Sequence, residues 1–427
     1  PQAASTQRSR ASLTLRFACL LLALQCHSPL SRGGDEVPLR VATFNVSLYG
    51  NHAGELTARL ESGEDEQAKR LAAIIQIVDP DVLLLNEIDY DADQRAVELF
   101  NQRYLAQPQS IDGVVNPRGI HFRYRFAAPC NTGIPSGFDL NRDGRVGGEV
   151  GSDDYAADCW GYGRYPGQYG MAILSKLPID VDKSRTFRQF RWIDMDGAAL
   201  PDFASSTSPD DWYEAEALER FPLSSKSHWD VVIRTPLGEL HVLASHPTPP
   251  VFDGPEDRNG LRNSDEIRFW RDYVSWTADK PAYHRDDGGL QGALAPDASF
   301  VILGDLNADP VDGDSTSAIA DLLDCERVDA SQAPASRGGA EQGQRQAGAN
   351  AVQQGDPSTD TLDAPDDPGP GNLRVDYVLP SANLAIVRSG VFWPAGDERH
   401  ARVIASRKAA SSDHRMVWID LVGKKNK

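Results

Sequence analysis

The stretch 301–310 combines side chains that could do chemistry with a segment that would hold them in place. It opens with Val-Ile-Leu, an apolar and partly β-branched run that predicts a short buried strand. The strand ends at Gly304, and the alternating Asp305 and Asn307 would project the same way. Short oxygen-bearing side chains at the end of a sheet are typical of a site that holds a phosphate or a metal ion. The alternative is an Asp/Asn-rich turn that caps the next helix.

Other predicted strands also end close to polar side chains. These strands and residues are Leu39–Val46 with Asn45, Asp81–Glu87 with Glu87 itself, Glu239–Ser245 followed by His246, Leu373–Pro380 with Asp376, and the last strand, preceded by Asp413 and His414. A single His or Asp in such a place is more often a cap or part of a turn. A buried glutamate is costly unless it is paired or bound to a metal. We therefore interpret the repeated pattern as one site at one end of a sheet.

These residue types suit metal-assisted hydrolysis of a phosphoester. The reaction needs a nucleophilic water, neutralisation of the phosphate oxygens and assistance to the departing oxygen. Magnesium prefers oxygen ligands, which carboxylates and amides supply. An aspartate that is hydrogen-bonded to a histidine ring fixes its tautomer and favours the charged imidazolium.

Apolar periodicity predicts the strands and helices that would position these residues. Helical spacing is found at Glu64–Val78, about 91–104, Asn263–Thr277 and Thr316–Leu323, and a hairpin joins Trp229–Thr235 to Glu239–Ser245. Ser62 and Asp65 could form a capping box at the first helix. Strands joined by hairpins or single helices favour an α/β (α+β) fold in which two packed, mostly antiparallel sheets are flanked by helices.

The charge of the chain bears on its partners. The 427 residues carry a formal net charge of -19, and 40% of them are hydrophobic, which allows a large folded core. A protein that holds long nucleic acid mainly by neutralising phosphates usually has a basic surface. A small phosphorylated substrate, or an anion held through a bound cation, therefore fits the charge better. A groove for nucleic acid would have to be local.

Residues 1–36 have the composition of a secretory signal peptide and linker. Arginines precede the apolar run Phe17–Leu24, which is too short to span a membrane, and Ser, Pro and Gly follow it. We therefore expect a secreted, periplasmic or cell-surface protein. Cys26 could instead anchor a lipoprotein, although Gln25 before it is unfavourable. The sequence starts at Pro1, so we expect its initiating end to be missing or trimmed, and no later segment is long and apolar enough to cross a membrane.

We interpret residues 37–424 as one domain with insertions at about 105–168, 183–228 and 329–372. The second insertion is polar. The third is rich in Gln, Gly, Ala, Pro and Asp without periodicity, which predicts a disordered or loosely held loop. The polar segment Pro247–Asn263 could form a substrate lid, a second cation site or a solvated loop.

The first insertion contains half of a calcium-binding pattern. Oxygen-bearing side chains at Asp139, Asn141 and Asp143, followed by Gly144, match the first half of a calcium loop. The glutamate that such a loop carries at its twelfth position is replaced by Val150. A structural calcium site and an ordinary turn therefore remain alternatives.

Cys130 and Cys159 flank the same glycine-rich loop. In an exported protein they could form a disulfide worth about 3 kcal/mol. Two unpaired thiols are the alternative, because connectivity cannot be read from a sequence.

The ordered motifs resemble those of the endonuclease/exonuclease/phosphatase superfamily, which has the pancreatic-deoxyribonuclease-like fold, and they indicate an exported bacterial-type member. The matching segments are Thr43–Asn45, Leu85–Glu87, Gly170–Ser175, Ser245–His246, Gly304–Asn307, Arg374–Tyr377 and Ser412–His414. The first three are weak alone, but the ordered set, which extends from about residue 39 to 421, is specific. The resemblance implies a four-layer α/β sandwich and metal-dependent hydrolysis of phosphoesters.

The resemblance also implies roles for individual residues. Glu87 is expected to be the main ligand of Mg²⁺ or Mn²⁺, helped by Asn45 and Asp413. Asp305 and Asn307 are expected to position the attacking water and the scissile phosphate.

Two histidines complete the expected site. His414, oriented by Asp376, is expected to act as a general base or phosphate contact. His246 is expected to serve the phosphate or the leaving group from the other side. Which of these histidines and Asp305 is the acid or the base stays open.

The sequence thus predicts an exported, metal-dependent phosphoesterase that cleaves a phosphomonoester or a phosphodiester, and we expect a monomer. One alternative is a non-specific nuclease acting on DNA or RNA. The other is a catalytically inactive, calcium-stabilised binding module. The intact set of site residues argues against inactivity, because loss of catalysis usually removes at least one of them.

Overall fold

The computed structural model describes residues 37–203, 211–277, 282–404 and 410–424. The predicted signal peptide and Cys26 lie outside this part of the chain. Across the described residues, no helix combines the length and apolar character needed to cross a membrane.

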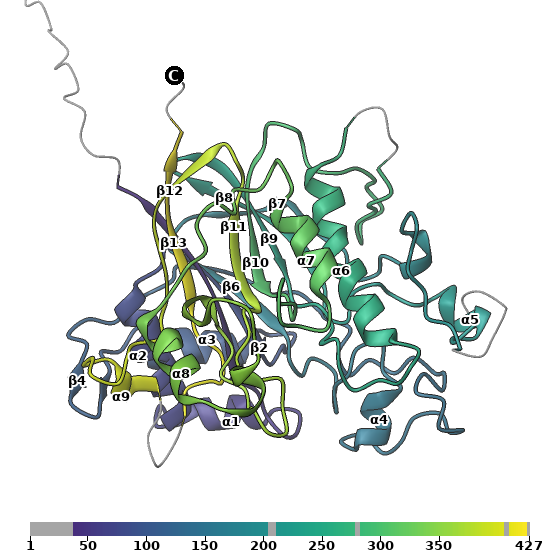
Figure 1. Ribbon diagram of the computed structural model, residues 1–427, viewed down its shortest axis with the longest axis horizontal. Helices are drawn as coiled ribbons and strands as arrows, with labels where there is room; N and C mark the ends of the chain where they lie inside the picture. Colours follow the sequence, from purple (N-terminus) through teal and green to yellow (C-terminus); the bar gives the residue numbers. More distant parts are fainter. Residues whose placement is uncertain (1–36, 204–210, 278–281, 405–409, 425–427) are drawn as a thin grey trace, which may run out of the picture. The chain divides into compact units, whose positions relative to one another are not determined.

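Two large sheets form the centre of the fold (Figure 1). Their strands are β1 Leu39–Leu48, β2 Val82–Ile88, β5 Tyr124–Phe126, β6 Met171–Ser175, β7 Ile179–Thr186, β8 His228–Thr235, β9 Gly238–Ser245, β10 Ser299–Asp305, β11 Asp376–Pro380, β12 Leu384–Val391 and β13 Val417–Gly423. The first sheet has the order β12-β13-β1-β2-β6-β5 and the second β11-β10-β9-β8-β7. The pairs β1–β2 and β9–β10 are parallel, and the other neighbours are antiparallel. The predicted mostly antiparallel arrangement is confirmed.

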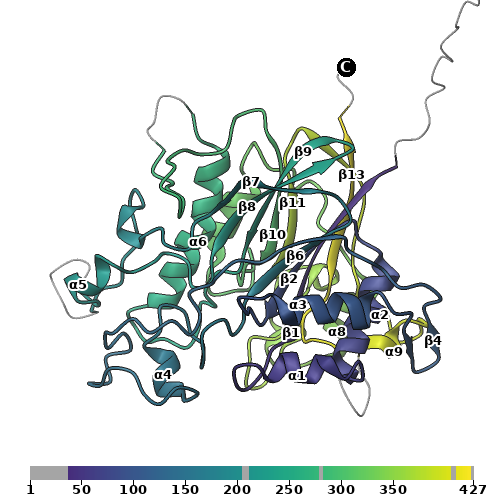
Figure 2. The ribbon, with the colours of Figure 1, turned by 180° about the vertical axis from the view of Figure 1, so that it is seen from behind.

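Side chains alternate along the strands between two apolar layers, and this alternation packs the sheets face to face. Val41 and Val242 belong to a buried cluster that both sheets share. Their neighbours point the other way: Ala42 lies in the cluster with the helices of the first sheet, and Leu243 in the cluster with those of the second. The order of layers is therefore helices, sheet, sheet, helices (Figure 2). The expected four-layer sandwich is confirmed.

Several of the nine α-helices in the described part of the chain cover the outer faces of the sheets. The nine are α1 Glu55–Glu61, α2 Glu66–Val78, α3 Arg95–Leu99, α4 Asp153–Ala157, α5 Ala215–Leu218, α6 Arg258–Val274, α7 Thr316–Leu323, α8 Arg337–Arg345 and α9 Ala401–Ile404. The first three pack on the first sheet, and α6 and α7 pack on the second. The predicted bounds of α7 are confirmed, whereas α6 begins at Arg258 instead of Asn263.

The capping of α2 differs from the expected capping box. Asp65 is itself the N-cap, and its carboxylate accepts the Ala68 N–H at 2.9 Å. The hydroxyl of Ser62 instead accepts the N–H of Glu64 at 3.0 Å. The helix therefore begins at a single capping residue.

The predicted insertions carry more structure than their composition indicates. Phe187, Phe190 and Trp192 are buried in the cluster with α6, so the second insertion contributes core rather than only a polar surface. In the third, the Ser336 hydroxyl accepts the Gly339 N–H at 3.1 Å and caps α8. The expectation of a disordered or loosely held loop is wrong for this segment.

Cys130 and Cys159 are buried and unpaired, so the alternative of a disulfide is not realised between them. The Cys130 thiol lies 2.8 Å from the Thr132 hydroxyl, and the Cys159 thiol donates to the Tyr155 carbonyl at 3.3 Å. Burial raises the pKa of Cys130, and it raises that of Cys159 to about 12. Both thiols are therefore protonated and unreactive at neutral pH.

Candidate active site

The polar residues at the strand ends converge at one end of the two sheets. Asn45 lies in β1 and Glu87 in β2, and these strands run in parallel. His246 directly follows β9, which is parallel to β10. Asp305 ends β10 and pairs with Asp376 at the start of β11. Because parallel strands end at the same edge of a sheet, the topology itself assembles the site.

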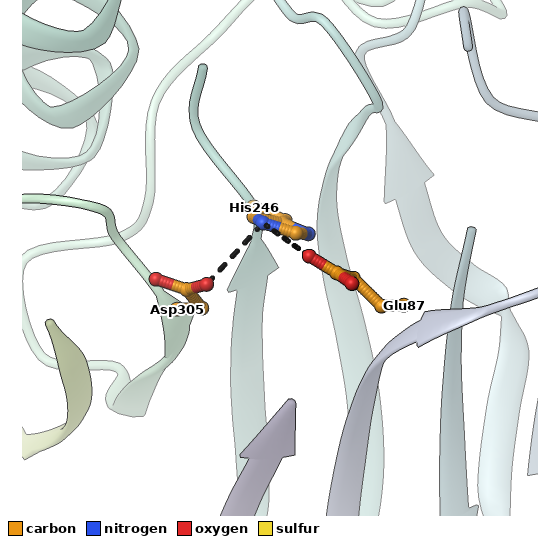
Figure 3. A group of neighbouring side chains, drawn as sticks. All are labelled: Glu87, His246 and Asp305. Carbon is orange, nitrogen blue, oxygen red and sulfur yellow. Dashed lines mark ion pairs between the residues drawn. The ribbon is translucent and has the colours of Figure 1, made fainter. Parts of the chain in front are cut away.

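Glu87, His246 and Asp305 form the first group of the site (Figure 3). The Nε2 atom of His246 lies 3.4 Å from Asp305 Oδ2 and 4.0 Å from Glu87 Oε1. His246 and Asp305 are buried, whereas the Glu87 side chain is 23% exposed. Their ligand atoms lie within 4.8 Å of one another. Two carboxylates and an imidazole at this spacing can share a cation, which can reach them from the Glu87 side.

Asp305, Asp376 and His414 form the second group. Asp376 Oδ2 lies 2.8 Å from Nδ1 of His414, and Asp305 Oδ2 lies 3.7 Å from its Nε2. Because a carboxylate accepts at Nδ1, we assign a proton to that nitrogen. The Ser412 hydroxyl holds the segment by donating to the Asn45 carbonyl at 2.7 Å and accepting the His414 N–H at 3.0 Å.

The side chain of Asn45 bridges the two carboxylates. Its Nδ2 donates to Asp305 Oδ2 at 3.0 Å and to Glu87 Oε1 at 3.1 Å. Its oxygen accepts the N–H of Ser47 at 3.1 Å. A metal ion would need that oxygen, so the amide must turn over before Asn45 can take the expected ligand role.

Charges within the site shift its pKa values. Burial opposes ionisation of Asp305, but His414 and His246 hold its pKa below the ordinary range. Burial likewise opposes the charged form of His414, yet Asp376 and Asp305 raise its pKa well above the ordinary value. Burial raises the pKa of Asp376, and His414 opposes that effect. At neutral pH, Asp305 is therefore an ionised acceptor and His414 a charged donor.

The backbone is unusual where the site residues lie. Glu87 and Asn307 adopt positive φ angles of 57° and 50°, a conformation that costs energy and is often found at functional sites. Gly304 has φ 150°, and a Cβ there would lie 2.1 Å from the Ser245 carbonyl oxygen. Only glycine allows β10 to approach the strand that delivers His246.

Asn307 and Asp413 lie outside the two groups. The Asn307 N–H donates to Asp305 Oδ1 at 2.9 Å, and its Nδ2 donates to the Pro247 carbonyl at 3.1 Å. Asp413 is exposed, and neither group of metal-ligating atoms among the described residues includes it. Asn307 thus orients Asp305, and the metal-ligand role of Asp413 stays a prediction.

Sequence reasoning missed buried polar residues that join the strand ends. Asn86 donates to the Ser245 carbonyl at 3.3 Å and accepts the Asp305 N–H at 3.4 Å, so it links the two sheets. On α6, Glu266 accepts a backbone N–H of the loop after β9 at 2.6 Å, and Asn263 donates to a carbonyl after β10 at 2.9 Å. The sequence signal that could have found Asn263 and Glu266 is their three-residue spacing, which puts both on one face of the helix.

The oxygen atoms of the candidate calcium loop are used within the loop. The Asp139 carboxylate accepts the N–H groups of Asp143 and Gly144 at 3.1 and 2.8 Å. Asn141 accepts the Asp143 N–H at 3.1 Å. None of the metal-ligating groups in the described part of the chain includes these residues. Calcium binding at Asp139, Asn141 and Asp143 stays a prediction.

The first group fits a divalent cation. Glu87 and Asp305 supply the carboxylate oxygens that Mg²⁺ and Mn²⁺ prefer. His246 Nδ1 and Asp376 Oδ1 are buried without a hydrogen-bond partner. The fit to a cation rests on the donor set itself, two carboxylates and an imidazole whose ligand atoms lie within 4.8 Å of one another.

The fold and the site define the class of the protein. The model of the Endonuclease/Exonuclease/phosphatase family matches residues 42–414. The chain therefore belongs to this family, and it is a hydrolase of phosphoester bonds. The family and the enzyme class expected from the ordered motifs are confirmed.

Solved structures with low sequence identity resemble the chain. An endonuclease/exonuclease/phosphatase from Beutenbergia cavernae DSM 12333 is 17% identical, with 91% of this chain and 72% of that chain covered and a TM-score of 0.45. Sphingomyelinase C from Streptomyces griseocarneus is 14% identical, with coverages of 90% and 99% and a TM-score of 0.42. A mutant beta toxin from Staphylococcus aureus with bound magnesium ions is 14% identical, with coverages of 90% and 99% and a TM-score of 0.41. No curated protein matches the chain.

Proposed function

We propose that the chain is a divalent-metal-dependent phosphoesterase that cleaves a phosphomonoester or phosphodiester by attack of water. The observation that carries the proposal is the position of Asp305 Oδ2. It lies 3.0 Å from Asn45 Nδ2, 3.4 Å from His246 Nε2 and 3.7 Å from His414 Nε2. A cation bound beside Glu87 would neutralise phosphate oxygens and lower the pKa of a bound water.

The residues of the chain divide the remaining work. Asp305, fixed by the Asn307 N–H, accepts a hydrogen bond from the attacking water and orients it toward the phosphate. His414, oriented by Asp376, donates from Nε2 to a phosphate oxygen as negative charge develops. His246 contacts the phosphate or the leaving group from the other side of Asp305.

We propose a small phosphate ester, not long nucleic acid, as the substrate. A net charge of -19 opposes the approach of a polyanion. The two groups of the site also contain three carboxylates, Glu87, Asp305 and Asp376. A single phosphate held through a cation fits this balance of charge better than a nucleic-acid backbone.

We also propose that the protein is exported through residues 1–36 and acts as a monomer. The support for export is the basic, apolar and polar order of that segment. N-terminal sequencing of the protein released by a secreting host should find a start beyond Leu24, and light scattering should give the mass of one chain. Retention of the run Phe17–Leu24 would contradict export, and twice that mass would contradict the monomer.

A substrate panel tests the proposed activity. The protein is assayed with Mg²⁺ or Mn²⁺ on p-nitrophenyl phosphate, bis-p-nitrophenyl phosphate, phospholipid head groups and plasmid DNA. We expect turnover of a small ester that EDTA stops and added metal restores. His414→Ala should abolish it, whereas His121→Ala, which changes an exposed histidine, should not. If none of the esters is turned over, the proposed activity is contradicted. A preference for plasmid DNA would favour a nuclease.

A further inference from the structure

A buried lysine lies at the same end of the second sheet as the catalytic groups. Lys226 is two residues before β8, whose first residue, His228, pairs with Ser245 of β9. The residue that follows Ser245 is His246. Antiparallel pairing therefore places Lys226 at the sheet end from which His246 enters the site.

Lys226 has no partner for its charge. Every other lysine that the structure describes forms an ion pair; these are Lys69, Lys176, Lys183 and Lys424. Lys226 is 6% exposed, yet among the described residues its ammonium forms no ion pair and no hydrogen bond. The residue is mostly buried while its ammonium lacks a counter-charge within the described part of the chain, so the ammonium is available to an incoming anion.

The carboxylates whose charges act most strongly on Lys226 form no ion pair with its ammonium. Burial lowers the pKa of Lys226, and the charges of Glu266, Glu87 and Asp305 oppose this, in that order. Both oxygens of Glu266 are already bound to backbone, to the Ser225 N–H at 2.9 Å and to the Thr248 N–H at 2.6 Å. The ammonium therefore lies in the field of the active-site carboxylates without being neutralised by contact.

The backbone around Lys226 is fixed from several sides. Its carbonyl accepts the Asn131 N–H at 2.9 Å, and Asn131 Nδ2 donates to the Ser224 carbonyl at 2.8 Å. The ring of His228 lies between two groups: its Nδ1 is 3.1 Å from the Ser224 hydroxyl, and its Nε2 is 2.9 Å from the Glu266 carbonyl oxygen. A cation placed on so rigid a segment is pre-organised for an incoming anion.

We propose that Lys226 is a phosphate-binding residue that contacts a non-bridging oxygen of the substrate. The inference rests on the proposed function and adds a contact made by the protein itself. A metal ion at Glu87 and the ammonium of Lys226 would flank the phosphate with two positive charges. The opposing view is that Lys226 only balances the acidic site, in which case its loss should tighten Mg²⁺ binding and leave phosphate binding to the Mg²⁺-loaded protein unchanged.

Lys226→Met tests the inference because it removes the charge and keeps the length of the side chain. In calorimetric titrations we expect inorganic phosphate to bind about 100-fold more weakly to the Mg²⁺-loaded variant. Mg²⁺ alone should bind as tightly as to wild type or more tightly, because a nearby positive charge is gone. Lys226→Arg should recover part of the phosphate affinity. Lys183→Met, at an exposed lysine paired with Glu239, should change neither.

Steady-state kinetics and spectroscopy complete the test. With a small phosphate ester, Lys226→Met should raise KM by about ten-fold or more. If the variant does not fold, the ammonium resonance of Lys226 in the Mg²⁺-loaded wild type can be followed by NMR, and it should shift on addition of phosphate. Unchanged phosphate affinity, or an ammonium signal that phosphate leaves unmoved, would overturn the inference. Phosphate binding that depends on Lys226 in a protein without turnover would instead contradict the proposed function alone.

Discussion

The charge on His414 depends on two carboxylates that contact its two ring nitrogens. Asp376 lies 2.8 Å from Nδ1 and Asp305 3.7 Å from Nε2. Against the effect of burial, both raise the pKa of His414 well above its ordinary value. The protonated ring is therefore the form that meets substrate at neutral pH, and it is lost as the pH rises through that raised pKa.

Asp376→Asn should move the pH dependence of the reaction. Without the Asp376 charge the pKa of His414 falls, so the alkaline limb of kcat/KM should shift to lower pH by about 1–2 units. The measurement is a pH profile on the preferred ester, with an NMR titration of the His414 ring beside it. An alkaline limb that stays in place would show that the protonated ring is not the active form.

Single residues show where sequence reasoning succeeds and where it stops. His246, Asp305 and His414 could be predicted because each lies directly beside the end or the start of a recognisable strand. The orientation of Asn45 could not, because it depends on a hydrogen bond to Ser47 that no spacing encodes. Lys226 was missed because a lone lysine in a serine-rich segment carries no periodic signal.

The approach of β10 to β9 is the element-level feature on which the site depends. Gly304→Ala would place a Cβ 2.1 Å from the Ser245 carbonyl oxygen and would hold an L residue at φ 150°. We expect a loss of roughly 2 kcal/mol or more in the free energy of unfolding. Activity should also fall, because Asp305 and His246 would separate.

Chemical denaturation and kcat/KM measure the two effects of Gly304→Ala. Gly423→Ala is the matched control, because it changes a glycine at the end of β13 around which nothing lies within 4 Å. Equal stability and activity in Gly304→Ala and wild type would contradict the close approach of the strands.

Elements with clear periodicity could be predicted, and those held by tertiary contacts could not. The bounds of α7 follow from its apolar spacing and its polar flanks. In contrast, α8 has no apolar face in its sequence. Its Gly338 packs against the backbone of Trp393, where a Cβ would lie 2.3 Å from the carbonyl oxygen. Packing of this kind cannot be read from composition.

Because acidic residues are in excess, repulsion between neighbouring carboxylates lowers the stability of the folded protein. Asp360 is a buried example, and burial together with Asp309, Asp312 and Asp356 raises its pKa to about 7. The folded state then holds a proton that the unfolded state releases near its ordinary pKa of 3.8. Stability should therefore fall as the pH rises between these values.

Asp360→Asn should stabilise the protein above pH 7 and leave it unchanged near pH 3.5. The gain at pH 8 is at most about 4 kcal/mol, since each pKa unit corresponds to about 1.4 kcal/mol. Thermal unfolding at the two pH values measures it, with Asp93→Asn at an exposed aspartate as the control. A gain of the same size at both pH values would contradict the raised pKa.

At the scale of the whole molecule, the order of layers could be predicted because strand alternation and helix periodicity both survive in the sequence. The parallel pairing that gathers Asn45 with Glu87, and His246 with Asp305, could not be derived from spacing alone. It followed from the resemblance of the ordered motifs to a known family.

The most direct test of the central claim is the kcat of Asp305→Asn on bis-p-nitrophenyl phosphate with Mg²⁺. The substitution keeps the shape of the side chain and removes the charge that three donors surround. We predict a fall in kcat of about 1,000-fold or more in a variant whose circular dichroism shows the wild-type fold, with Asp321→Asn on the exposed face of α7 behaving as wild type. Metal-dependent hydrolysis at the wild-type rate in Asp305→Asn would contradict the account.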